Sequence, residues 1–129
     1  MRTLAFPSSL GDAADRITIL AIKSERMRDP EKLANVRKEL AEISGVFFAV
    51  VLRTPEFDAL VERLKKINEQ LWEIEDAIRL CEAKSDFGPE FIRLARSVYQ
   101  TNDRRAAIKR EINTLLGSDL VEEKSYSSI

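Results

Sequence analysis

Charged and amide side chains recur at helical spacing in two parts of the sequence, near its beginning and near its end. Successive residues step by about 100° around a helix, so five charged residues near the beginning fall within one sector about 100° wide: Asp12, Asp15, Arg16, Lys23 and Arg26. Near the end, Arg105 falls within an apolar stripe, with amide and lysine side chains beside it. A guanidinium stays charged and pairs with carboxylates and phosphates. The candidate ligand-binding residues are Asp12, Asp15, Arg16, Lys23, Glu75, Asn102, Arg105 and Lys109.

The position of Arg105 has two interpretations, which the sequence leaves open. In an antiparallel hairpin that folds about residues 86–88, Arg105 lies level with Asn68, and Glu75 lies one turn beyond. A buried Arg105–Glu75 contact would then be a structural ion pair that sets the register of the two helices. Alternatively, the guanidinium binds a ligand. The charged sector of residues 12–26 likewise either faces solvent or faces the Asn102–Arg105–Lys109 ridge across a polar pocket.

Two carboxylate pairs indicate a different chemistry. They have the form ExxE…ExxD, which all-α nucleotide pyrophosphohydrolases use to bind magnesium, and they are Glu39, Glu42, Glu73 and Asp76. Oxygen ligands that converge from facing helices could bridge Mg²⁺ to a triphosphate. Glu73 and Asp76, however, point away from the apolar stripe of their own helix. We therefore expect solvent-exposed carboxylates, keep a magnesium-dependent enzyme as an alternative, and otherwise predict no cofactor.

Composition excludes several classes of site. The 129-residue chain has no histidine, so a Ser-His-Asp triad, a Cys-His pair and a histidine zinc site cannot form. Cys81 is the only cysteine, which excludes an intramolecular disulfide and favours a reducing, cytoplasmic compartment. The net charge of −1 argues against nucleic-acid binding. No apolar run approaches the ~20 residues of a membrane span, so we expect no membrane association.

Helix-capping residues and breakers divide the chain into four expected helices. Ser8 or Ser9 can cap the first, which runs to about residue 27. A polar cap followed by proline opens the second and third helices at positions 29–30 and 54–55. The loop 85–88 precedes a fourth helix, which ends near residue 116 before Gly117, at a left-handed cap position. Gly45 leaves the continuity of the second helix open, and residues 118–129 form a docked or frayed tail.

The third and fourth helices carry apolar residues with an alternating spacing of three and four, which predicts a long left-handed pairing. The seam of the third helix is Phe57, Leu60, Leu64, Ile67, Leu71, Ile74, Ile78 and Cys81. Because the loop is short, residues 55–84 and 89–116 should form an antiparallel hairpin. With the first two helices packed against it, we predict a single all-α domain over residues 1–129 with a four-helix, coiled-coil-like arrangement. Dimerisation through the hairpin is also expected.

Four blocks give the chain a family resemblance: GDAADRITILAIK (11–23), LWEIEDAIR (71–79), NDRRAAIKREIN (102–113) and EEKSY (122–126). Together they resemble a family of short all-α bacterial proteins of unknown function. The resemblance implies one full-length domain, and it assigns no catalytic residue.

The sequence therefore favours a non-catalytic binding or protein-interaction module. Its arginine-bearing polar groove would take a small anionic ligand or a partner helix, and a homodimer is the expected assembly. The alternatives are the magnesium-dependent pyrophosphohydrolase and a purely structural oligomerisation protein.

Overall fold

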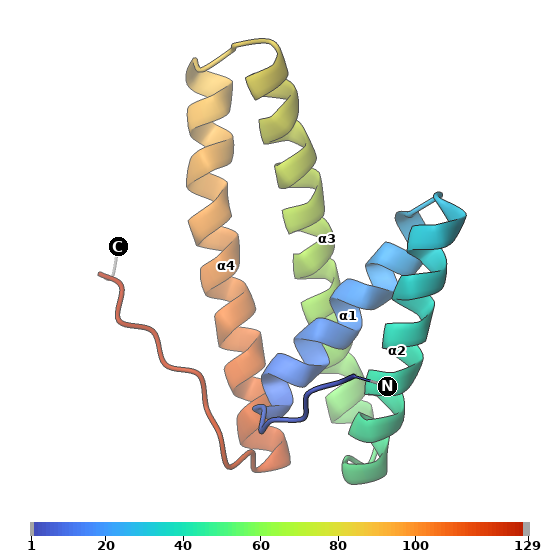
Figure 1. The fold of residues 1–129 in the computed structure, drawn as a ribbon. Coiled ribbons are helices and arrows are strands. Elements are labelled where there is room, and N and C mark those ends of the chain that lie inside the picture. Colours follow the sequence, from blue (N-terminus) through green and yellow to red (C-terminus); the bar gives the residue numbers. More distant parts are fainter. Residues whose placement is uncertain (1, 128–129) are drawn as a thin grey trace.

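The computed structural model describes residues 2–127, which form four α-helices joined by short connections (Figure 1). The helices are α1 (Leu10–Arg26), α2 (Pro30–Val50), α3 (Pro55–Ala83) and α4 (Pro89–Leu116). No strand occurs among these residues. The prediction of an all-α fold is confirmed.

The helix ends follow from local capping. The Ser9 hydroxyl accepts a hydrogen bond from the Asp12 N–H, and the Thr54 hydroxyl accepts one from the Phe57 N–H. Proline occupies the first turn of α2, α3 and α4, where its missing N–H costs no intrahelical bond. At the end of α4, Gly117 has a φ of 64°, which is the left-handed cap expected there. Helix α2 passes through Gly45 without a break.

Helices α3 and α4 form the predicted antiparallel hairpin (Figure 1). Seam residues of both helices are buried, among them Phe57, Leu64, Leu94, Ile108 and Ile112. Because the apolar spacing continues along both helices, they stay paired up to the turn that joins them. The hairpin is the longest part of the molecule, and its turn end extends beyond the other two helices (Figure 1).

Helix α1 crosses the open end of the hairpin and contacts all three other helices. It can do so because apolar side chains occupy much of its circumference, so that Ala14, Leu20 and Ile22 are all buried. Helix α2 packs along α1. The sequence predicts that α2 also packs against the hairpin, but α1 lies between them. Helix α2 reaches α3 only near its C-terminal end, where the Phe47 and Phe57 rings stack with centroids 5.7 Å apart.

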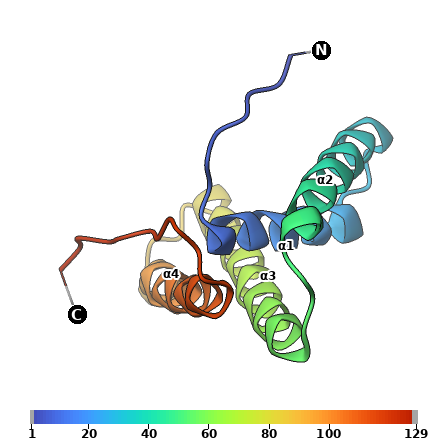
Figure 2. The same cartoon turned by 90° about the horizontal axis from the view of Figure 1, so that it is seen from below.

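Residues 117–127, after α4, run without regular structure along the outside of the molecule (Figure 2). Residues 128–129 of the predicted tail lie outside the described residues. Within residues 2–127, no helix is both long enough and apolar enough to cross a membrane.

Candidate functional site

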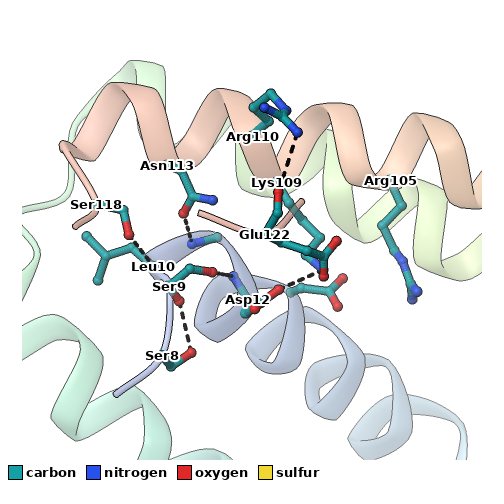
Figure 3. A network of polar contacts seen from close by, with 12 residues as sticks. Ser8, Ser9, Leu10, Asp12, Arg105, Lys109, Arg110, Asn113, Ser118 and Glu122 are labelled. Atoms are coloured by element: carbon teal, nitrogen blue, oxygen red, sulfur yellow. Dashed lines mark hydrogen bonds and ion pairs between the residues drawn. The ribbon is translucent and has the colours of Figure 1, made fainter. Parts of the chain in front are cut away.

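The first turn of α1 is joined to the last turns of α4 by hydrogen bonds (Figure 3). The Gly11 N–H donates to Asn113 Oδ1 at 2.7 Å, and the Leu10 N–H donates to Ser118 Oγ at 3.1 Å. A Cβ atom at Gly11 would lie only 2.5 Å from the Lys109 carbonyl oxygen, so the close approach requires glycine. Because protein atoms already accept from these N–H groups, this helix N-terminus is not free to bind an anion.

Beside this junction lies an ion cluster that joins α1, α4 and the tail. The Lys109 Nζ lies 2.7 Å from Asp12 Oδ1 and 3.1 Å from Glu122 Oε2, and the lysine side chain is only 10% exposed (Figure 3). Burial of the ammonium lowers the pKa of Lys109, but hydrogen bonds to Asp12 and Glu122 outweigh that effect and hold the pKa above its usual value. The charge of nearby Asp15 acts in the same direction.

A second polar contact chain crosses from α1 to α4 through Asn68 of α3, which is 5% exposed. The Asn68 Nδ2 donates to Asp15 Oδ1 and to Thr18 Oγ1, both at 2.8 Å. The Asn68 Oδ1 accepts from Arg105 Nη1 at 3.3 Å. The amide thus satisfies a buried carboxylate on one side and holds a guanidinium on the other.

The ion pair between Arg105 and Glu75, which one of the two interpretations requires, does not form among residues 2–127. Glu75 instead pairs with Arg79, one turn further along α3, at 3.4 Å. Glu75 is exposed on the flank of its helix, where an exposed i, i+4 partner is closer than the half-buried seam position. Among residues 2–127, no carboxylate lies within ion-pair distance of the Arg105 guanidinium.

Arg105 lines a groove of about 540 Å³ between the second half of α1 and the hairpin. Its apolar lining consists of Ile19, Ile22, Leu71, Trp72 and Val98. Its polar lining consists of Asn68, Glu75, Asp76, Arg79, Asn102 and Arg105. The groove therefore joins an apolar surface to a guanidinium whose hydrogen-bond partner in the protein is a neutral amide.

The structure does not bring the eight candidate residues together in one site. Glu75, Asn102 and Arg105 line the groove, and Asp15 is linked to them through Asn68.

Asp12 and Lys109 lie together in the ion cluster with the tail. Arg16 pairs with Glu39 of α2, and Lys23 is not among the residues that line the groove.

Three residues that matter here were not among the predicted site residues: Asn68, Trp72 and Glu122. Asn68 is an amide next to the apolar seam, and such a residue is worth testing for burial whenever its neighbours are apolar. Trp72 is the only tryptophan in the chain and follows the seam residue Leu71. Glu122 opens the EEKSY block, but no local pattern connects that block to Lys109.

The two carboxylate pairs of the magnesium alternative do not converge. Glu39 pairs with Arg16, and Glu73 pairs with Arg26 at 2.8 Å. Glu42 is exposed on α2, which packs along α1 and away from the carboxylates of α3. Across the described part of the chain, no group of three or more acidic or cysteine side chains is placed to hold a metal ion.

The fold and groove thus define a small all-helical protein with a recess lined by apolar, amide and charged side chains of both signs. The chain matches DUF6165, a family of unknown function, over residues 6–129, and it belongs to that family. The resemblance to a family of unknown function is therefore confirmed. No curated protein and no solved structure matches the chain.

Proposed function

We propose that this protein is a non-catalytic binding module whose groove between α1 and the α3–α4 hairpin holds a small amphipathic anion. The observation that carries the proposal is the Arg105 guanidinium, which lines the groove with only the Asn68 amide as its hydrogen-bond acceptor among the described residues. A guanidinium has five N–H donors and remains charged, so most of its binding capacity is available to a ligand.

The lining of the groove indicates the kind of ligand. Its volume of about 540 Å³ falls within the roughly 300–1,000 Å³ typical of small-molecule sites. Leu71, Trp72 and Val98 offer apolar contact, and Asn102 places an amide beside Arg105. A ligand with an apolar body and one carboxylate, sulfonate or phosphate group would use both kinds of surface.

The test uses two fluorescent probes that differ in charge. 8-Anilinonaphthalene-1-sulfonate has an aromatic body with a sulfonate, and N-phenyl-1-naphthylamine has the same body without it. Arg105→Met should weaken binding of the sulfonate by about tenfold to a hundredfold, because a charge-assisted hydrogen bond contributes about 1.5–3 kcal/mol. It should leave binding of the neutral probe unchanged. Trp72, which lies in the groove, reports occupancy by quenching and energy transfer.

Arg104→Met is the matched control for that experiment. Arg104 is the adjacent arginine, but it lines a separate hollow, where its Nη2 lies 3.2 Å from Thr101 Oγ1. The Arg104→Met variant should bind both probes as the wild type does. Equal weakening by the two variants, or no weakening by Arg105→Met, would contradict an anion site at Arg105.

A second candidate function, assembly with another copy of the chain, is favoured by an exposed apolar surface at the open end of the hairpin. This end surface comprises Val46, Val50, Leu52, Leu115, Leu120 and Val121, all exposed. Several of them border a hollow of about 600 Å³ beside the N-terminal residues Pro7 and Ser8. Exposed apolar patches of this kind mark interaction surfaces. We infer that two copies of the chain form a homodimer through this surface. We also infer a cytoplasmic location, because the lone Cys81 fits a reducing compartment.

Leu52→Glu tests the assembly. Leu52 is 82% exposed, so glutamate there should not disturb the folded monomer but should disrupt contact with a second copy. We expect the wild-type Tm to rise with protein concentration and the Tm of the variant to be independent of it. Leu80→Glu is the control on the hairpin, where Leu80 is 60% exposed. If Leu80→Glu removes the concentration dependence instead, the hairpin is the interface, as the sequence had suggested.

A further inference from the structure

The C-terminal tail places a carboxylate against Lys109, one helical turn along α4 from the groove residue Arg105. Glu122 contacts Lys109, and Lys109 follows Arg105 by four residues, on the same face of α4 (Figure 3). The tail is also held by Arg110, whose Nη2 lies 3.4 Å from the Glu122 carbonyl oxygen and 3.3 Å from Glu123 Oε2.

The tail and the groove are each held by polar contacts, and the two sets of contacts adjoin on α1 at Asp12 and Asp15. From the tail, the chain of contacts runs through Lys109 to Asp12. Asp15 lies one turn of α1 from Asp12 and close enough to Lys109 to act on its charge. Asp15 accepts from Asn68, which in turn accepts from Arg105 in the groove.

The charges of this polar layer do not balance while the tail is docked. Three carboxylates, Asp12, Asp15 and Glu122, stand against two cations, Lys109 and Arg105. Without the charge of Glu122, the layer would be neutral. The docked tail therefore gives this layer a net negative charge, which disfavours another anion close by.

Resting on the anion site proposed above, we propose that the tail is a built-in regulator of the groove: docked Glu122 lowers the groove's affinity for an anionic ligand, and release or neutralisation of Glu122 raises it. By linkage, an anion bound at Arg105 weakens tail docking by the same factor. The Glu122 carboxylate and an anion bound at Arg105 repel each other. Both charges are partly shielded from solvent, so salt screens this repulsion measurably but not completely.

The variant that tests this is Glu122→Gln in the full chain. Glutamine keeps an oxygen that can accept from Lys109 Nζ, so the tail can remain docked while its charge is removed. Binding of 8-anilinonaphthalene-1-sulfonate should tighten about two- to fourfold at low ionic strength, because removing the negative charge of Glu122 removes its Coulomb repulsion of the bound sulfonate. The gain should shrink in high salt, and N-phenyl-1-naphthylamine should bind unchanged.

Glu123→Gln is the matched control, because it removes the same charge from the same tail while its carboxylate contacts Arg110 outside the cluster. Tightening by Glu122→Gln alone supports the proposal. Equal tightening by both variants overturns it, since that is a net-charge effect, and so does weaker or unchanged binding by Glu122→Gln. The Arg105→Met variant distinguishes failure of the anion site from failure of its regulation by the tail. If Arg105→Met leaves sulfonate binding intact, the anion site is absent, and so is its regulation.

Discussion

Replacing Gly11 with alanine should destabilise the protein by about 3 kcal/mol, the upper part of the usual range for overpacking a close contact. The added Cβ would lie 2.5 Å from the Lys109 carbonyl oxygen and 2.9 Å from Asn113 Oδ1. The nearer atom belongs to the backbone of α4, so no side-chain rotation relieves the clash and the two helices must separate. Separation also lengthens the 2.7 Å hydrogen bond from the Gly11 N–H to Asn113. Urea unfolding monitored by circular dichroism measures the loss.

Gly45→Ala is the control that the chain itself provides. Gly45 also lies within a helix, but a Cβ atom there would meet nothing within 4 Å. Alanine should therefore stabilise α2 by about 0.5–1 kcal/mol through its better helix propensity. If both substitutions change the free energy of unfolding in the same direction, the close α1–α4 approach is not what limits stability.

Replacing Lys109 with methionine should lower the free energy of unfolding by about 2–3 kcal/mol at neutral pH. This is slightly less than the roughly 3–5 kcal/mol lost when a fully buried ion pair is broken. Methionine fills similar space, but it leaves the carboxylates of Asp12 and Glu122 facing each other without a cation. Both carboxylates are partly exposed, and rehydration limits the loss. The exposed Lys66, which pairs with Glu62 on the surface of α3, gives the control: Lys66→Met should change stability by less than about 0.5 kcal/mol.

The pH dependence of the Lys109 contribution has a definite sign. The folded-state pKa of Lys109 lies above the unfolded value of about 10.4. The stabilisation is therefore fully present below that value and is lost as the pH rises through the folded-state pKa. The difference in unfolding free energy between wild type and Lys109→Met should be constant at neutral pH and shrink above about pH 10.4. A constant difference up to higher pH would mean that lost packing, rather than lost charge, destabilises the variant.

The helix boundaries could be predicted because local chemistry determines them. Ser9 and Thr54 accept from N–H groups within their own helices, and Gly117 has a conformation that glycine adopts without strain. The hairpin seam was equally accessible, since regular apolar spacing implies a partner with the same spacing. Arg105 was correctly placed on that seam, and it is half-buried in the structure.

The arrangement of the polar residues could not be predicted, because it depends on which helices face each other. A helical wheel puts Asp12 and Arg16 in one sector, yet Asp12 faces Lys109 of α4 while Arg16 faces Glu39 of α2. Helix α1 lies between the hairpin and α2, so the two edges of a single stripe meet different partners. The contact of Glu122 with Lys109 could not be predicted for a related reason. An irregular tail has no periodicity from which its contacts could be inferred.

The junction between Leu10–Gly11 and Asn113–Ser118 also constrains the order in which the protein can mature during synthesis. The hydrogen-bonded residues in this junction are 102 and 108 positions apart. Helix α1 is synthesised before α4, so its N-terminal turn cannot form these hydrogen bonds until Asn113 and Ser118 have left the ribosome. Helices α3 and α4, whose contacts are nearest along the chain at their turn, can pair while α1 is still unanchored. A chain that ended before residue 113 would keep the residues that pair at the hairpin turn, but its first helix would lack the Asn113 and Ser118 acceptors.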